Sequence, residues 1–447
     1  MRKAPFLFSI LVACAAPPSK EAPPPVATNE APAPAPAPTH EEKKEEPKKE
    51  EPKKEEAPPK DHCGTNAWAM FGHDPARTSA SDGCVEGALK ITWTFRPLGL
   101  CGYKAANGRV QHAVADKEAA FASGDCASAP AVWRIDPTNG KTVWTMSRAD
   151  YSRASWPTLA GERVVSSDDG VFFIDRANGT WKGRELDIWG EAIVDGDRMF
   201  VDNTWQLDGA GPFVGRFDGA GKWIWKASRF DGARGKNVAD VGGIALSGST
   251  VVHAAAAGPR GAPLLSAHDA DSGDRKWSAT GSWPESAPSI ADGRVFTLER
   301  WSKENDDRLV ARDLSSGTVV WSQTAGWARG APPAIGPKHV LVHTRDAVKA
   351  FDRSNGAPAW STPLPRTTPL VQSMTTLAVA TGSNTVVVTS ETRIVVLKLD
   401  DGKEVWSGPV VKGDGPICGS PIVVGKTVYV AIRTLTNMGS LVRLEPQ

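Results

Sequence analysis

Asp136-Pro137-Thr138-Asn139-Gly140-Lys141-Thr142-Val143-Trp144 decides the fold, because its spacing of Asp, Gly and Trp returns along the chain. Full copies stand at Asp269/Gly273/Trp277, Asp313/Gly317/Trp321 and Asp352/Gly356/Trp360, and shortened copies at Asp218/Gly221/Trp225 and Asp400/Gly402/Trp406. A repeat of roughly 40–50 residues that is built from short strands predicts a radial β array. Most of the conspicuous residues are therefore expected to be scaffold.

Each copy has the chemistry of a hairpin turn. Aspartate and asparagine side chains bond nearby backbone groups and begin tight turns, and glycine accepts a positive φ. Residues 136–140 therefore predict a turn, and residues 141–144 the start of the next strand. In one repeat the expected strands are 287–291, 294–298, 309–312 and 318–321. Four short antiparallel strands per repeat form the blade of a β-propeller.

The number of blades can be estimated from the tryptophans of the expected fourth strands. They are Trp144, Trp225, Trp277, Trp321, Trp360 and Trp406, and a degenerate copy at 175–183 places Gly183 at the tryptophan position. The segment around Trp93 predicts a fourth strand without three strands before it, whereas residues 420–423, 426–430 and 440–444 predict three strands without a fourth. The sequence thus predicts an all-β, eight-bladed propeller of four-stranded antiparallel blades, closed by an N-terminal strand. Closure leaves few free strand edges.

The repeat resembles the tryptophan-docking repeat (PQQ-like repeat) of the quinoprotein-like propellers, and residues 68–78 are similar to the lead-in segment of that family. The resemblance covers residues 66–447 and implies the propeller fold. The family includes quinone-dependent alcohol and glucose dehydrogenases, and also a non-catalytic lipoprotein of the outer-membrane β-barrel assembly machinery. The resemblance therefore implies either a dehydrogenase or a protein-interaction scaffold.

The N-terminus predicts export and anchoring. Arg2 and Lys3 precede a short apolar stretch, which is too short for a stable membrane span and is typical of a secretory signal. Residues 11–14 resemble the lipobox of bacterial lipoproteins, which implies cleavage of residues 1–13 and lipid attachment at Cys14. A plain signal peptide that happens to contain a cysteine is the alternative. The expected location is the bacterial outer membrane, on its periplasmic or its surface side.

Residues 14–61 are expected to be a disordered tether, and residues 62–447 the propeller. The tether is rich in Pro and Ala and then in alternating Glu and Lys pairs, with almost no apolar surface to offset the entropy of ordering. The whole chain has 52 basic and 51 acidic residues. Without a basic stripe, nucleic acid is not expected as a partner.

Five cysteines remain after Cys14, namely Cys63, Cys84, Cys101, Cys126 and Cys418, and disulfides are common in exported proteins. Cys63 and Cys84 bracket the lead-in segment and could join its ends. The others leave two alternatives: a Cys101–Cys418 disulfide across the closure of the ring with Cys126 free, or a Cys101–Cys126 disulfide within one blade. The spacing alone does not choose between them.

No catalytic or metal site is expected from the motifs. The quinone dehydrogenases of the family carry adjacent cysteines against the cofactor, and this sequence has none. Asp269 begins a faint calcium-loop pattern that coincides with the repeat turn. His339 and His343 fall in a strand-like segment, where i and i+4 lie about 13 Å apart, so we expect two exposed histidines and no shared ion. No cofactor is predicted, with pyrroloquinoline quinone and calcium as the alternative.

Several residues lie outside the repeat pattern and remain candidates for binding. Trp156, Trp283 and Trp327 fall where one blade leads to the next, so they are expected near one rim, where they either pack between blades or contact a partner. The loops 231–242 and 302–308 are further candidates. The sequence favours a non-enzymatic, membrane-tethered interaction scaffold with a protein partner in the cell envelope. A quinone-dependent dehydrogenase and a carbohydrate- or cell-wall-binding propeller are the alternatives.

Overall fold

The computed structural model describes most of the chain after residue 62. The described residues are 63–98, 108–126, 129–147, 156–167, 171–184, 191–203, 213–228, 242–255, 265–280, 283–284, 286–300, 307–328, 331–365, 376–390, 393–409, 417–434 and 439–447. The chain divides into two units, Met1–Pro58 and Pro59–Gln447, and every described residue belongs to the second. The predicted signal peptide, the whole predicted tether with Cys14, and Cys101 lie outside the described residues.

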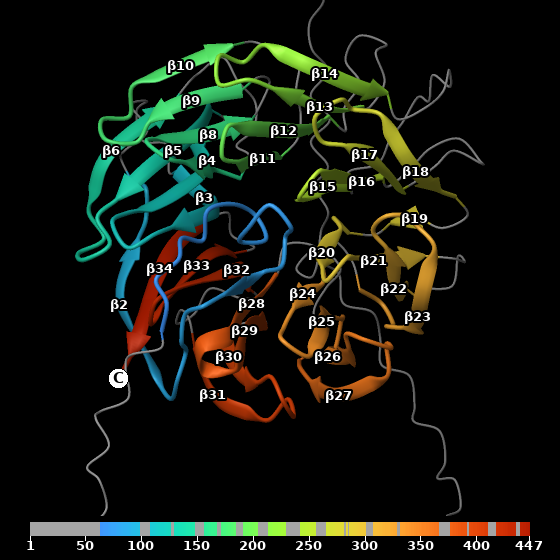
Figure 1. Cartoon of the computed structure of the whole chain (residues 1–447). Helices are drawn as coiled ribbons and strands as arrows, with labels where there is room; N and C mark the ends of the chain where they lie inside the picture. The colour runs from blue at the N-terminus through green and yellow to red at the C-terminus, as the bar shows by residue number, and fades with distance from the viewer. Residues whose placement is uncertain are drawn as a thin grey trace, which may run out of the picture. The chain divides into compact units, whose positions relative to one another are not determined.

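The second unit consists of eight antiparallel sheets placed around a common centre (Figure 1). Blade 1 holds β3 (Gly108–Ala115), β4 (Ala120–Cys126), β5 (Ala129–Ile135) and β6 (Thr142–Ser147); blade 2 holds β7 (Thr158–Ala160), β8 (Arg163–Ser167), β9 (Val171–Asp175) and β10 (Trp181–Arg184). Blade 3 holds β11 (Ala192–Asp195), β12 (Arg198–Asn203), β13 (Phe213–Phe217) and β14 (Trp223–Ser228); blade 4 holds β15 (Gly242–Ser247), β16 (Thr250–Ala255), β17 (Leu265–Asp269) and β18 (Arg275–Ala279).

The remaining blades repeat this order. Blade 5 holds β19 (Trp283–Pro284), β20 (Ser289–Ala291), β21 (Arg294–Arg300), β22 (Asp307–Asp313) and β23 (Val319–Thr324); blade 6 holds β24 (Ala334–Ile335), β25 (His339–His343), β26 (Ala347–Asp352) and β27 (Pro358–Pro363). Blade 7 holds β28 (Leu377–Ala380), the 3₁₀ turn η1 (Thr381–Ser383), β29 (Thr385–Ser390), β30 (Arg393–Lys398) and β31 (Glu404–Pro409), and β1 (Ala80–Ser81) joins it in parallel.

Blade 8 closes the ring with strands from both ends of the unit. It combines β2 (Leu89–Phe95) with β32 (Ile417–Val424), β33 (Thr427–Thr434) and β34 (Gly439–Pro446). Leu89 of β2 lies opposite Pro446 and Phe95 opposite Leu441 in an antiparallel pair. The predicted eight-bladed fold and its closure by an N-terminal strand are therefore confirmed.

A β-bulge precedes every docking tryptophan. In blade 1, Arg134 lies opposite Trp144 while Ile135 lies opposite Thr142, so Val143 is an extra residue. The same shift of register precedes Trp93, Trp225, Trp277, Trp321, Trp360 and Trp406. A bulge re-aims the side chain that follows it. Blade 2 pairs β9 and β10 in straight register, and Gly183 stands in the tryptophan position there.

The bulged tryptophans reach the turn of the next blade. Trp93, Trp144, Trp225, Trp277, Trp321 and Trp360 lie over Gly140, Gly179, Gly273, Gly317, Gly356 and Gly402 in turn, each glycine with a positive φ. A Cβ on any of these glycines would come within 2.4 to 2.8 Å of the indole or of a side chain beside it. Five of the indoles also donate Nε1–H to a turn carbonyl, as Trp277 does to Leu314 at 2.8 Å. Only glycine accepts both the positive φ and the closely packed indole, which explains why a glycine recurs at this position.

Gly221, the repeat glycine of blade 3, differs from the other repeat glycines. Its φ is 74°, and its N–H donates to the carbonyl of Asp218 at 2.9 Å, three residues back, whereas Gly140 reaches Asp136, four residues back. The preceding blade has Gly183 in the tryptophan position. Gly221 is therefore a repeat glycine in a turn that is one residue shorter than that of Gly140. Its positive φ accounts for the glycine.

Candidate functional site

The lead-in segment, residues 63–88, is hydrogen-bonded to the innermost part of seven blades. Its backbone meets Ala115, Leu159, Leu246, Ile290, Ile335, Val379 and Gly425, which belong to blades 1, 2, 4, 5, 6, 7 and 8. In Figure 1 the segment runs in blue inside the ring of sheets. Among the described residues no backbone hydrogen bond joins the lead-in to blade 3. Blade 3 is therefore the place where the lead-in departs from its regular path.

A buried arginine makes the contact to blade 3 instead. Arg77 is 1% exposed, and its Nη2 lies 2.9 Å from Oε2 of Glu191, directly before β11. Arg77 also donates to the carbonyl oxygens of Ile244 and of Phe71, the latter at 3.2 Å. A quarter of the Glu191 side chain remains exposed (26%), yet desolvation raises the pKa of its carboxyl, and the charge of Arg77 opposes that rise.

The detour of the lead-in is a tight turn around Arg77. Gly72 and His73 both have left-handed backbone conformations, with φ of 73° and 78°. The carboxylate of Asp74 accepts hydrogen bonds from the backbone N–H of Thr78, at 3.0 Å, and from its hydroxyl. The N–H of Ser79 then returns to the carbonyl of Gly72 at 2.8 Å. A left-handed histidine is uncommon, so tertiary contacts must enforce this shape.

A pocket opens where the turn leaves blade 3. Its volume is about 340 Å³. It is lined by the lead-in, by the first hairpin of blade 2 and by the first hairpin of blade 3; the lining residues are Ala67, Ala69, Met70, His73, Asp74, Pro75, Leu159, Ala160, Gly161, Val194, Asp195 and Gly196. We call it the lead-in pocket. It lies at the hairpin end of the interface between blades 2 and 3.

His73 lines the lead-in pocket and contacts Asp74 and Trp68. Its Nδ1 lies 3.3 Å from Oδ2 of Asp74, and its ring meets Trp68 edge-on at 5.0 Å. Its Nε2 is buried and has no hydrogen-bond partner among the described residues. Asp195, across the pocket, pairs with Arg198. The pocket is therefore lined by two aspartates, of which Asp74 already accepts hydrogen bonds from Thr78 and Asp195 pairs with Arg198.

The interface between blades 2 and 3 is packed differently from the interfaces that hold a docking tryptophan. Because Gly183 provides no indole, Trp223 of blade 3 packs against the interface from the other side, in a cluster that joins Val165 and Val171 to Met199 and Phe217. The Trp223 ring lies 5.3 Å from that of Phe213 and 6.0 Å from that of Phe217. It crosses Gly215, where a Cβ would come within 2.5 Å of the indole. Trp223 thus replaces the absent docking tryptophan.

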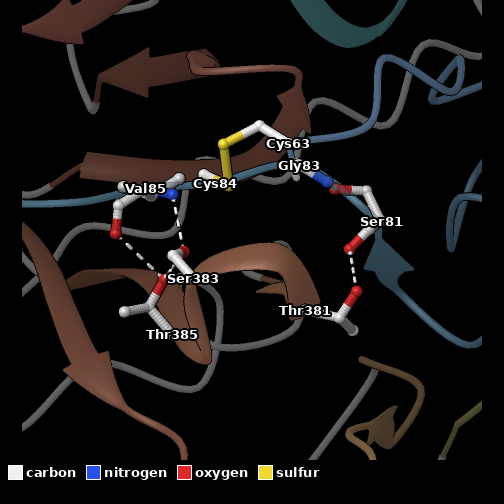
Figure 2. Close-up of a disulfide and its surroundings, with 8 residues drawn as sticks. All are labelled: Cys63, Ser81, Gly83, Cys84, Val85, Thr381, Ser383 and Thr385. Carbon is white, nitrogen blue, oxygen red and sulfur yellow. Dashed lines mark hydrogen bonds between the residues drawn. A yellow bond between two sulfur atoms is a disulfide. The ribbon is translucent and has the colours of Figure 1, made fainter. Parts of the chain in front are cut away.

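A disulfide fixes both ends of the lead-in. Cys63 and Cys84 are bonded, with their Cα atoms 5.3 Å apart. Figure 2 shows the neighbouring contacts with blade 7: the Val85 N–H donates to Ser383 Oγ at 2.7 Å, and Thr385 Oγ1 donates to the Val85 carbonyl at 3.1 Å. The segment that shapes the pocket is therefore held covalently as well as by hydrogen bonds.

Cys126 is also disulfide-bonded, so the alternative in which it is free is wrong. Its side chain is fully buried at the end of β4. The sulfur that it pairs with lies outside the described side chains, as do Cys101 and the side chain of Cys418. The innermost strand of blade 1 begins at Gly108, and Cys101 precedes it.

Other predicted site residues have structural surroundings. His343 is buried, at 5% exposure, and not exposed as expected, because β25 is an inner strand that is packed on both faces. His339 is partly exposed, and its Nδ1 lies 3.0 Å from the carbonyl of Leu399. Asp269 accepts hydrogen bonds from the N–H groups of Ser272 and Asp271, which lower its pKa to about 2. Among the described residues no cluster of three acidic, histidine or cysteine side chains could hold a metal ion.

Two of the three rim tryptophans have described side chains. Trp156 stacks near Phe71 of the lead-in at 4.5 Å and near His112 at 4.1 Å. Trp327 lies under the guanidinium of Arg345, 5.1 Å from its ring centre. The backbone of Trp283 pairs with that of Arg300 in the sheet of blade 5. The structure does not describe the Trp283 side chain, residues 229–241 or residues 301–306. Trp156, which precedes β7 of blade 2, therefore packs against the lead-in and against β3 of blade 1.

Fold and docking residues define an eight-bladed propeller of tryptophan-docking repeats. The family model described as outer membrane protein assembly factor BamB matches residues 64–323, 211–373 and 344–444, and the chain belongs to this family. No curated protein sequence matches the chain significantly.

Solved structures share the fold. A europium-containing methanol dehydrogenase is 12% identical, with a TM-score of 0.66 over 85% of this chain and 98% of that one. BamB from Moraxella catarrhalis is 14% identical, with a TM-score of 0.51 over 80% of this chain and 98% of that one. The computationally designed Ika8 protein is 15% identical, with a TM-score of 0.56 over 76% and 96%. At these identities the similarity establishes the fold alone.

Proposed function

We propose that this chain is a non-enzymatic interaction scaffold, held on the bacterial outer membrane by a lipid on Cys14 and facing the periplasm, and that it acts in outer-membrane protein assembly. The observation that carries the proposal is the family match, which extends from residue 64 to residue 444 and so takes in the whole propeller. The lipobox-like segment 11–14 and the Pro-, Glu- and Lys-rich tether support the anchored location. Among the described residues, no helix has the length and apolarity needed to cross a bilayer.

The construction of the ring suits a rigid platform. The lead-in ties seven blades together at their innermost parts, and docking tryptophans join neighbouring blades. A rigid scaffold of this kind can present loops and hairpins to a partner without losing conformational entropy on binding.

The outer strands carry exposed apolar side chains that a partner could cover. Ile91, Val143, Ile224, Val319 and Val320 are each between 42% and 53% exposed. They lie on β2, β6, β14 and β23, the outermost strands of blades 8, 1, 3 and 5.

Affinity purification from detergent-solubilised membranes tests the proposal. The native chain is expected to co-purify with outer-membrane barrel proteins, and Cys14→Ser is expected to lose incorporation of labelled fatty acid and membrane association. A clean pull-down would contradict the scaffold. The two alternatives have their own outcomes: dye reduction after addition of pyrroloquinoline quinone and calcium would establish a dehydrogenase, and retention on peptidoglycan a cell-wall binder.

A further inference from the structure

We propose that the junction between blades 3 and 4 is acid-sensitive: protonation of the buried His268 opens the turn that receives Trp225. The inference goes beyond the proposed scaffold role and does not depend on it. The turn follows His268 directly, and the indole of Trp225 from blade 3 lies over its glycine, Gly273. Trp225 also donates its Nε1–H to the carbonyl of Ala270 at 3.1 Å.

His268 supports this turn from inside the blade. The side chain is buried, and its Nδ1 lies 3.1 Å from the carbonyl oxygen of Gly273. A carbonyl only accepts, so Nδ1 carries the proton and Nε2 keeps its lone pair. Nε2 lies 3.1 Å from Oγ of Ser266, so that hydroxyl donates to it. The neutral imidazole therefore has partners at both nitrogens and joins the docking glycine to β17.

Blade 5 has a permanent cation at the corresponding position. Arg312 precedes the turn aspartate of its blade as His268 does in blade 4, and it has the same place in the register of its sheet. Arg312 also donates to the carbonyl of its docking glycine, Gly317, at 3.2 Å. The carboxylate of Glu299 accepts hydrogen bonds from its Nε at 3.0 Å and from its Nη2 at 2.9 Å. A buried cation is therefore accommodated here when a carboxylate lies beside it.

Blade 4 has no counterpart of Glu299. Glu299 lies four residues after the residue that faces Arg312 in the sheet, and the same count in blade 4 leads to Ala255. Among the described residues, the hydrogen-bond partners of the His268 ring are a hydroxyl and a backbone carbonyl. A protonated His268 would be a buried cation without a carboxylate beside it, which is costly.

The neighbouring charges add to this cost. Burial lowers the pKa of His268 from the ordinary 6.5; the carbonyl of Gly273 opposes that shift, and His253 and Arg275 increase it. Asp202 of blade 3 lies 3.3 Å from Nε2 of His253, so this carboxylate faces the other histidine. The unfolded chain therefore binds the His268 proton more tightly, and the folded junction loses stability as the pH falls below 6.5.

The other charged groups of the junction have partners of their own. They form ion pairs, namely Arg216 with Asp271, Lys276 with Asp269 and Arg77 with Glu191. Asp274 accepts a hydrogen bond from the hydroxyl of Ser272 at 2.7 Å. Desolvation raises the pKa of Glu191, so its protonation acts on stability in the opposite direction. A variant of His268 is therefore needed to separate the two contributions.

Opening of the turn is the shortest way to hydrate a protonated His268. Asp271 and Ser272 of the turn are exposed, whereas the rest of the His268 surroundings is packed between blades 3 and 4. A turn that moves outward loses the indole of Trp225, because the indole lies on its glycine. Acid pH should therefore release this one docking contact before the others.

NMR of the full chain with isotope-labelled tryptophan tests the proposal. The indole N–H signal of Trp225 is followed between about pH 7.5 and about pH 5, which spans the ordinary histidine pKa. We expect this signal to shift and weaken on acidification, while that of Trp277, which docks on blade 5, stays unchanged. A Trp225 signal that does not respond, or an equal response of Trp277, would overturn the proposal.

Two variants identify the titrating group. His268→Gln should abolish the response of Trp225, since glutamine keeps an N–H donor for Gly273 and does not titrate. Ser266→Asp should abolish it as well, because a carboxylate in this position can pair with the imidazolium, as Glu299 pairs with Arg312 in blade 5. A native response in either folded variant would contradict the assignment to His268.

His339→Gln is the matched control. Nδ1 of His339 also lies near a turn carbonyl, that of Leu399 at 3.0 Å, but the side chain is partly exposed. This variant should keep the native response of Trp225, and a loss of the response would contradict the proposal. Thermal unfolding at neutral pH shows that each variant is folded. None of these measurements uses a partner protein, so the acid-sensitive junction is tested separately from the scaffold.

Discussion

Trp93 lies against Gly140, a residue of the neighbouring blade, and donates its indole N–H to the carbonyl of Pro137 at 2.9 Å. A Cβ on Gly140 would come within 2.8 Å of the ring. Since Trp93 belongs to the strand that closes the ring, this contact joins the N-terminal strand to the first complete blade. The same relationship, repeated around the ring, leads to predictions about stability.

Replacing a docking glycine should destabilise the propeller through the indole above it. In Gly317→Ala the new Cβ would lie 2.5 Å from Trp277, at a φ of 72°. We expect a loss of about 1–3 kcal/mol from overpacking, in addition to the backbone strain. Urea unfolding measures it. Gly293→Ala is the control, because its φ is 67° but nothing lies within 4 Å; equal losses in both variants would show that the indole contact contributes nothing.

Removing Trp223 should weaken the interface between blades 2 and 3. Trp223→Ala leaves Phe213, Phe217 and Gly215 without the ring that covers them, and large-to-small changes in a core cost about 3–5 kcal/mol when the side chain is fully buried. Trp223 is partly exposed, so we expect about 2 kcal/mol, with faster amide exchange in β10 and β13. Trp181→Ala, at a 37% exposed ring, serves as the comparison and should cost less.

Glu191 should make stability depend on pH in a defined direction. Its pKa is raised above the usual 4.5, chiefly by desolvation. The folded state therefore binds the proton more tightly than the unfolded state, and stability should rise as the pH falls from neutral towards 4.5. Urea unfolding at several pH values checks this. Glu191→Gln should abolish that rise, and a slope that persists in the variant would assign it to other groups.

The disulfide should hold the lead-in against local opening. Cys63 and Cys84 are 21 residues apart, and a crosslink over a loop of this length contributes roughly 3 kcal/mol. The double variant Cys63→Ser/Cys84→Ser should lose about that amount and be cleaved sooner by protease within residues 63–88. Unchanged protease resistance would mean that the backbone hydrogen bonds of the lead-in suffice.

The blades could be predicted because the turn and docking residues act at fixed spacing. Asp136 accepts the hydrogen bonds of a tight turn, and Gly140 supplies the positive φ of that turn. The same local requirements recur in the other repeats, so the spacing of these residues recurs as well. Gly183 in the tryptophan position indicated an irregular blade 2. The sequence did not predict which residue fills the interface next to it. The packing of Trp223 against residues of blades 2 and 3 is a contact between repeats, which the spacing within one repeat does not reveal.

The lead-in pocket could not be predicted from the sequence. It depends on the left-handed conformations of His73 and Arg77 and on an ion pair between Arg77 and Glu191, residues that no periodicity connects. The burial of His343 was missed for a related reason, since strand alternation does not reveal a sheet that is covered on both faces.

Site-specific photocross-linking in intact cells tests the central claim most directly. A photoreactive residue at Asp197, on the exposed first hairpin of blade 3, is compared with one at Asp292, which is exposed on the corresponding hairpin of blade 5. The account predicts one defined adduct with an outer-membrane assembly protein from position 197, and little from position 292. Identical products from both positions, or no protein adduct from either, would contradict it.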